Sequence, residues 1–150
     1  MRPFGVWSSL LLSMATLALT ACATTSSEPP PSLYRRLGGR EGIAGVVDAF
    51  VTNALADQRI GPAFKSLPAA RVGPLKSNIA DFLCENTGGP CSYVGRTMKE
   101  SHKGLALTKE DFDACNAALD KALDASKVAA PDKAEVMKLV QSLMPDIVGQ

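Results

Sequence analysis

The sequence predicts an all-α domain that follows an N-terminal targeting segment. Apolar residues recur at helical spacing in four long stretches, no stretch shows strand-like alternation, and aromatic residues make up only 5% of the chain. With 150 residues, the chain is long enough for one modest domain. Its formal net charge of +1 offers no electrostatic reason to expect a nucleic-acid partner.

Residues 1–21 are typical of an export signal. Arg2 precedes an apolar run over residues 6–21, which is short for a transmembrane helix and is closely followed by polar residues. The run ends in L-T-A-C (19–22), which resembles the lipobox of bacterial lipoproteins, in which the cysteine is lipidated and becomes the new N-terminus. We therefore expect cleavage before Cys22 and lipidation of its thiol. The alternative is an ordinary secretory signal in which Cys22 is incidental.

Residues 22–32 are predicted to be a tether. After Cys22 they read A-T-T-S-S-E-P-P-P-S, which cannot pack a core and whose prolines favour an extended chain. A cysteine that carries several acyl chains anchors stably to a membrane. We expect an exported protein, anchored by lipid to a bacterial cell membrane and facing the periplasm or held in the outer membrane, with the folded domain at residues 33–150.

The first long helix is predicted from Arg40 to Leu55. Its apolar residues follow the spacing i, i+3, i+4, i+7, i+8, i+11, i+12, which gives one apolar face. The Gly-Gly pair at 38–39 marks a tight turn before this helix. Residues 57–64 are expected to form a corner, because the Gly-Pro pair at 61–62 interrupts regular spacing.

Three later stretches also have helical spacing. The first ends at the breaker cluster 86–90, the second opens at Thr108 with a capping-box partner at Asp111, and Pro131 suits the first turn of the third. The shared apolar faces hold Leu75, Ile79, Phe82 and Leu83 in the first, Phe112, Cys115, Leu119, Ala122 and Leu123 in the second, and Val136, Leu139, Val140, Leu143, Met144 and Ile147 in the third.

Between these stretches a short helix is expected to carry His102, the only histidine of the chain. Met98, His102 and Leu105 have the spacing i, i+4, i+7, so they share one face of a helix. One imidazole is too few for a zinc site, which needs three or four ligands. It is enough for haem, where the porphyrin supplies four nitrogens. The alternative is a partly buried histidine with no ligand role.

Seven pieces of sequence, taken in order and spacing, match one family. They are S-L-Y-R-R-L-G-G-R-E-G-I (32–43), V-V-D-A-F (46–50), L-A-D (55–57), G-G-P (88–90), Y-V-G-R-T-M (93–98), H-K-G-L (102–105) and L-T-K-E-D-F-D (107–113). With them, residues 32–149 resemble the truncated haemoglobins, group I in particular. The resemblance implies an all-α truncated globin, a two-over-two helical sandwich in which helices 40–56, 71–85, 108–126 and 131–148 enclose haem b.

The resemblance also implies roles for single residues. His102 falls on the proximal iron ligand, and Phe64 falls on the corner phenylalanine that stacks on the haem. The implied apolar haem contacts are Leu75, Ile79, Phe82, Met98, Leu107 and Phe112. Core packing is the plainer interpretation of these apolar residues, and it is compatible with haem contact.

The ligand-side wall departs from the family pattern. Val51 stands where group I members usually carry tyrosine, Ile79 stands at the distal glutamine position, and Leu75 occupies the other distal position. Asn78 replaces the basic residue often found before that glutamine. We therefore expect an aliphatic distal pocket and a five-coordinate ferrous haem, unless Lys76 folds inward or an ordered water supplies a donor.

Three cysteines remain in the domain. The spacing of Cys84 and Cys91 fits no zinc pattern. In an oxidising compartment the two can form a disulfide, and the alternative is a pair of free thiols. Cys115 lies on an apolar helix face and is expected to be a small buried hydrophobe.

Three function classes follow from these features. The first is a lipid-anchored haemoglobin that reversibly binds a diatomic gas, to carry or sense oxygen or to bind nitric oxide. The second is a nitric oxide dioxygenase or a peroxidase-like enzyme, which needs a polar distal group and an external reductase. The third is a lipoprotein without haem that uses the globin fold as an interaction module. The expected partners are a gas ligand, a membrane and an external reductase.

Overall fold

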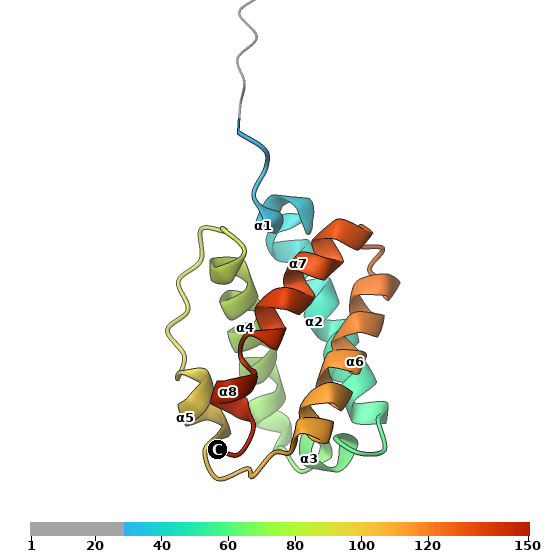
Figure 1. Cartoon of the computed structure of the whole chain (residues 1–150), viewed down its shortest axis with the longest axis vertical. Coiled ribbons are helices and arrows are strands. Elements are labelled where there is room, and N and C mark those ends of the chain that lie inside the picture. Colours follow the sequence, from blue (N-terminus) through green and yellow to red (C-terminus); the bar gives the residue numbers. More distant parts are fainter. Residues whose placement is uncertain (1–28) are drawn as a thin grey trace, which may run out of the picture.

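A computed structural model of the protein describes residues 29–150, and every regular element among them is an α-helix (Figure 1). The all-α prediction is therefore confirmed. The expected export signal and the lipidation of Cys22 lie outside the described residues. Within the described range, no helix is long and apolar enough to cross a membrane. The helices are α1 (Leu33–Arg36), α2 (Gly39–Ala56), α3 (Gly61–Lys65), α4 (Ala69–Asn86), α5 (Met98–His102), α6 (Lys109–Ala125), α7 (Ala130–Gln141) and α8 (Met144–Ile147).

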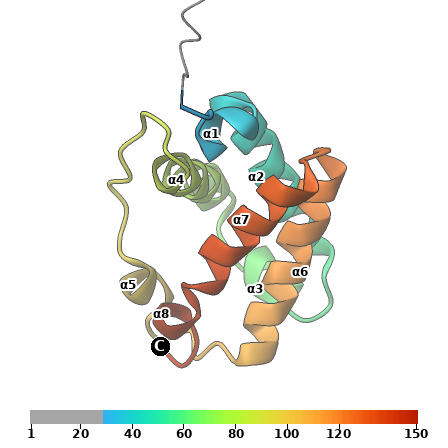
Figure 2. The same cartoon turned by 45° about the horizontal axis from the view of Figure 1, so that its top comes forward.

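Helix α2 forms the centre of the packing. It packs against both α6 and α4, and α6 packs in turn against α7. The buried core lies among these four helices and includes Val46, Val47, Leu83, Leu119 and Leu123. Figure 2 looks nearly along α4, which in this view is separated from α6 and α7. Helices α5 and α8 lie side by side at one end of the gap between the ribbons of α4 and α6.

The Gly-Gly pair at 38–39 forms the predicted turn. Gly38 and Gly39 have φ angles of 85° and 66°, a region that residues with a Cβ rarely occupy. Helix α1, which comes just before this turn, was not predicted. It is capped by Ser32, whose Oγ accepts a hydrogen bond from the backbone N–H of Arg35 at 3.4 Å.

The expected corner at 57–64 contains a short helix, so that prediction was only partly right. Gly61 and Pro62 open α3 instead of interrupting regular structure, because proline is tolerated in a first helical turn. Asp57 holds the turn before α3. Its Oδ1 accepts hydrogen bonds from the backbone N–H groups of Arg59 at 2.8 Å and Ile60 at 3.0 Å.

The last predicted helix, 131–148, is wrong in one respect, because the structure divides it into α7 and α8. Pro131 lies in the first turn of α7, as expected. Pro145 lies in the first turn of α8 and has no backbone N–H to continue the helical hydrogen bonds of α7. The apolar spacing continues across this break, so periodicity alone did not reveal it.

Candidate functional site

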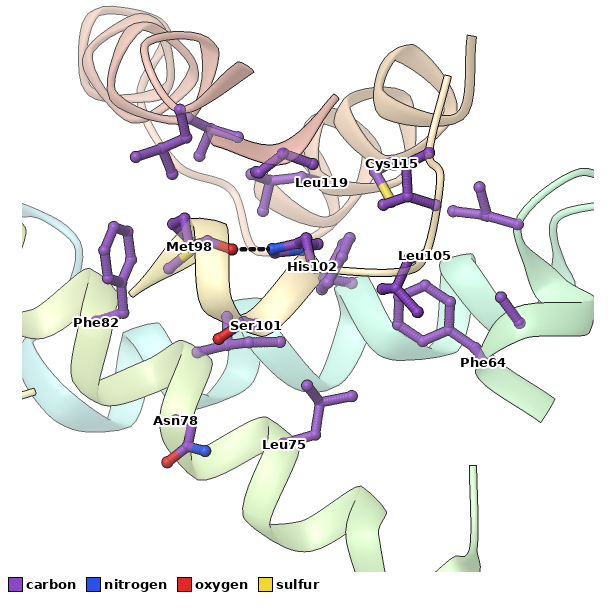
Figure 3. Close-up of a pocket in the computed structure, with 18 of the residues that line it drawn as sticks. Phe64, Leu75, Asn78, Phe82, Met98, Ser101, His102, Leu105, Cys115 and Leu119 are labelled. Atoms are coloured by element: carbon purple, nitrogen blue, oxygen red, sulfur yellow. Dashed lines mark hydrogen bonds between the residues drawn. The ribbon is translucent and has the colours of Figure 1, made fainter. Parts of the chain in front are cut away.

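A largely apolar cavity of about 540 Å³ opens between α4, α5 and α6, within the size range of cofactor pockets. Its walls include α2, α3, α7 and α8 as well, so every helix except α1 contributes to it. The residues predicted as haem contacts and as the iron ligand all line this cavity: Phe64, Leu75, Ile79, Phe82, Met98, His102, Leu107 and Phe112. Figure 3 shows part of this lining around His102.

His102 is the last residue of α5, and its ring is oriented by the helix that carries it. Nδ1 lies 2.7 Å from the backbone carbonyl oxygen of Met98 (Figure 3). A carbonyl oxygen only accepts, so Nδ1 carries the proton and donates it. In the neutral ring this leaves Nε2 with a free lone pair, which is the form in which histidine binds metal ions.

The helix that carries His102 is only five residues long and needs local support. A capping box at Thr97 and Glu100 supplies it. Thr97 Oγ1 accepts from the Glu100 backbone N–H at 3.2 Å, and Glu100 Oε2 accepts from the Thr97 backbone N–H at 3.1 Å. The side chain and backbone of Thr97 hold the pKa of Glu100 below its ordinary value. This second capping box was missed at the sequence level, although T-M-K-E fits the pattern.

The expected face formed by Met98, His102 and Leu105 needs a correction. Helix α5 ends at His102, because Lys103 leaves the helical region with a ψ of 128° and Gly104, with a φ of 81°, then turns the chain away. Leu105 therefore lies beyond the helix and is 57% exposed, although it still borders the cavity.

The chain after His102 is held by the C-terminal residues. The backbone N–H of Ala106 donates to the carbonyl of Gln150 at 3.1 Å, and that of Gly149 donates to the carbonyl of Leu107 at 2.9 Å. These two bonds hold the residues that follow His102 against the C-terminal residues. They join segments more than forty residues apart, so no local pattern could have predicted them.

The opposite wall comes from α2 and α4 and is mainly apolar. Leu75 points from α4 into the pocket in Figure 3, and Ile79 follows it one turn later. Phe50 of α2 meets Phe64 edge to face, with 6.1 Å between the ring centroids, and this contact fixes Phe64 at the base of the wall.

One detail of this wall differs from expectation. Val51 is only 2% exposed and packs in the core, and Val47 and Phe50 line the cavity instead. The physical reason is that α2 has two buried sides, one against the core and one against the cavity. Lys76 does not fold inward, because its Nζ pairs with Asp48 at 3.0 Å. Asn78 borders the cavity, but its amide points away from His102 (Figure 3).

Cys115 also lines the cavity and carries a thiol, a group that can bind iron once it is deprotonated. Burial, and then the charges of Asp111 and Asp57, raise the pKa of its thiol to about 11. The thiol therefore stays protonated at neutral pH, whereas iron binds the thiolate. Among residues 29–150, no cluster of three or more His, Cys, Asp or Glu side chains could hold a metal ion without further ligands.

Cys84 and Cys91 form a disulfide, which decides between the two alternatives left open by the sequence. The bond joins the last turn of α4 to the loop that leads towards α5.

Arg71 and Arg96 were missed at the sequence level. Both border the cavity and are exposed, and neither forms an ion pair with another described residue within 4 Å. One comes from the start of α4 and the other from the loop before α5. Because the two belong to separate elements, no sequence spacing links them.

Comparison with known proteins identifies the family. The family described as bacterial-like globin matches residues 32–148. Group 1 truncated hemoglobin GlbN of Mycolicibacterium paratuberculosis is 32% identical over 79% of this chain and 85% of its own length. This chain belongs to the group 1 truncated haemoglobins.

Solved structures of truncated haemoglobins have the same fold. The ferric truncated haemoglobin of Tetrahymena pyriformis is 30% identical, with a TM-score of 0.73 over 80% of this chain and 100% of its own. The 2/2 haemoglobin of Synechococcus, solved in the cyanomet state with covalently attached haem, is 28% identical, with a TM-score of 0.71 over the same shares. The predicted two-over-two truncated globin fold is therefore confirmed.

Membership of this family implies that the chain is a haem-binding globin, and its residues fit the group. The cavity offers an apolar space of suitable volume, a free Nε2 on His102, and two exposed arginines, Arg71 and Arg96, at its border. Apolar walls suit the porphyrin ring, and arginine pairs well with carboxylates such as the haem propionates.

Proposed function

We propose that this truncated haemoglobin reversibly binds a diatomic gas at a haem whose iron is ligated by His102. One observation carries the proposal: the His102 ring donates Nδ1–H to the Met98 carbonyl and keeps Nε2 free beside an apolar cavity. When bound, haem supplies an iron centre with one position open to a gas. The residues of the chain orient the imidazole, surround the ring and exclude water from the gas-binding side.

Haem b is the form that the residues favour. The sequence has no C-x-x-C-H motif for thioether attachment. The protonated thiol of Cys115 is a poor nucleophile. Non-covalent binding is instead supported by the apolar walls and by Arg71 and Arg96, which are free to pair with the two propionates.

An enzymatic role, either peroxidase-like or as a nitric oxide dioxygenase, has less support. His102 donates to a neutral carbonyl rather than to a carboxylate, so nothing drives its ring towards the electron-rich imidazolate form. Asp111 borders the cavity, but hydrogen bonds from Thr108 and a charge pair with Arg59 lower its pKa. It therefore stays ionised and is a poor proton donor. Any ferric protein formed would still need an external reductase.

The ligand-side wall supports a proposal about which gas is preferred. Leu75, Ile79 and Phe50 offer no hydrogen-bond donor, Lys76 is paired with Asp48, and the Asn78 amide is turned away from His102. We infer weak oxygen affinity, rapid oxygen release and a relative preference for carbon monoxide or nitric oxide.

Absorption spectra of the haem-loaded, ferrous protein test this function. Under argon, carbon monoxide and oxygen in turn, the spectrum should change with each gas and return when the gas is removed, with oxygen leaving much faster than carbon monoxide. Rapid turnover of peroxide would favour the enzyme. A protein that takes up no haem would favour an interaction module.

A further inference from the structure

The loop from Cys91 to Thr97 leads into the helix of His102 and is tied to α4 at its first residue. In Figure 1 this loop runs down one edge of the molecule, from the end of α4 to α5. Cys91 is bonded to Cys84, which is fully buried in the last turn of α4. The disulfide therefore fixes one end of a non-helical segment against the rigid core.

Tyr93 holds the middle of the loop. Its ring meets Phe82 of α4 edge to face, with 5.4 Å between centroids, and its hydroxyl donates to the Arg96 carbonyl at 2.7 Å. The ring covers Gly95 so closely that a Cβ at this residue would clash with it. The loop is thus folded around one aromatic ring, which packs on Phe82 and itself lines the cavity.

The same contacts continue to the imidazole. The Arg96 carbonyl also accepts a hydrogen bond from Ser101 Oγ at 3.4 Å, and Thr97 caps α5. The Met98 carbonyl then accepts from His102. A continuous series of contacts therefore runs from the disulfide to the ring of the iron ligand.

Helix α5 needs this support because it has little of its own. It contains no buried residue, and its main helix contact is α8. A five-residue helix is not stable without tertiary contacts. Apart from the C-terminal residues behind it, the anchored loop is what fixes the position at which α5 begins.

We propose that the Cys84–Cys91 disulfide and Tyr93 are positioning residues for His102, which direct its Nε2 into the cavity. The proposal rests on the proposed role of His102 as iron ligand. It follows that the protein holds haem tightly only with the disulfide formed, and that it is built to work where thiols are oxidised.

The surroundings of the disulfide suit a permanent bond rather than a switch. Cys91 is half-buried and Cys84 is fully buried, so an external thiolate would attack the sulfur of Cys91. The bond between Cys84 and Cys91 would then break and release the Cys84 thiolate into the core. Burial of a charged thiolate is unfavourable, so this step is slow.

The test compares Cys84→Ala/Cys91→Ala with the control Val136→Ala in the full chain. Val136 is buried in α7 and does not line the cavity, so its loss weakens the fold elsewhere. In haem-free protein, amide hydrogen exchange at residues 97–105 should speed up selectively in the double variant and not in the control. Equal protection in wild type and double variant would overturn the positioning role, whether or not the protein binds haem.

In haem-loaded protein, transfer of haem to an acceptor apoglobin should be about tenfold faster for the double variant, equivalent to ~1.4 kcal/mol. The iron–histidine stretching band of the ferrous form should also shift or broaden. If transfer rate and band both match wild type, the inference fails while the proposed function stands. If wild type takes up no haem, the proposed function fails, and the exchange measurement alone decides the positioning role.

Tyr93 provides a second pair of variants. Tyr93→Phe keeps the contact with Phe82 and loses the bond to Arg96, so it should shift the iron–histidine band only slightly. Tyr93→Leu loses both contacts and should approach the behaviour of the double variant. Identical spectra and transfer rates for Tyr93→Leu and wild type would remove Tyr93 from the proposal.

Discussion

Ile79 is the residue at which the chemistry of the gas-binding side is best adjusted. It lies on the cavity wall one turn after Leu75, and neither side chain can donate a hydrogen bond. Dioxygen carries a partial negative charge when it is bound at a haem site, so a hydrogen-bond donor on this wall stabilises it. The same donor stabilises bound carbon monoxide much less. Val51 is less suitable for the same purpose, because a larger side chain there would overpack the core.

Ile79→Gln should slow oxygen release by roughly 10- to 100-fold. A hydrogen bond to a charged group contributes about 1.5–3 kcal/mol, and each tenfold change is ~1.4 kcal/mol. Carbon monoxide release should change little. Ile79→Leu is the matched control, since it keeps the volume without a donor. Stopped-flow measurement of both gases checks this, and equal slowing of the two would contradict a hydrogen-bond effect.

At the scale of secondary-structure elements, the first turn of α6 is connected to the turn before α3. Arg59, from the turn before α3, pairs with Asp111 of α6 at 2.7 Å and donates to Thr108 Oγ1 at 3.2 Å. Asp111 also completes the predicted capping box, since its Oδ2 accepts from the Thr108 backbone N–H at 2.9 Å. This contact fixes α6, with Phe112 on its cavity side, against the corner that leads to Phe64.

The capping carboxylate predicts a pH dependence. Hydrogen bonds from the backbone and then the side chain of Thr108 lower the pKa of Asp111 from 3.8, with Arg59 adding to the effect. A lowered folded-state pKa contributes stability that is fully present above the unfolded value of 3.8 and is lost as the pH falls through the folded value.

Asp111→Asn should therefore lower the melting temperature at pH 7 and reduce its further fall below pH 3.8. Asp113→Asn is the control, because Asp113 forms only an exposed pair with Lys109, and such pairs contribute little. Thermal unfolding measured between pH 7 and pH 3 compares the two variants. A melting temperature for Asp111→Asn that matches wild type at neutral pH would show that the cap is not important for stability.

For the whole molecule, the described chain begins beside α1, at the end opposite α5 and α8 (Figures 1 and 2). We propose that an anchor at Cys22 attaches the domain to a membrane by this end. The His102 side of the cavity would then face away from the lipid surface, where an external reductase could reach it.

Mass spectrometry of the exported protein tests the anchor. We expect cleavage before Cys22 and a mass increase at that residue that corresponds to its acyl chains, because L-T-A-C ends the apolar run. An intact Met1, or a mature protein with a free Cys22 thiol, would contradict it. A Cys22→Ala variant in the same cells is the control for the assignment of the lipid.

The sequence was sufficient to predict the long helices and the part of the site that lies on them. His102 stood out as the single histidine, and helical spacing with the family resemblance selected Phe82, Ile79 and Phe112. Val51 was assigned to the cavity from the family resemblance, and spacing could not correct this because α2 has two buried sides, with Val51 in the core and Phe50 on the cavity.

Contacts between distant segments could not be predicted from local patterns. Arg71 and Arg96 meet at one cavity only because α4 and the loop before α5 are neighbours in the fold. The same holds for Gln150, which fixes the chain after His102. The break at Pro145 is a different case. A proline within a stretch of continuous helical spacing can either kink the helix or end it, and the spacing is the same for both outcomes.

The central claim is that, among the residues that the structure describes, His102 is the side chain that ligates the haem iron. The most direct test is a haem titration of wild type and His102→Gly, followed by ferrous spectra and the iron–histidine stretching band with and without added imidazole. Wild type should bind one haem per chain with a five-coordinate histidine spectrum, and His102→Gly should lose that band and regain it with imidazole. An unchanged spectrum and band in His102→Gly would mean that another side chain ligates the iron.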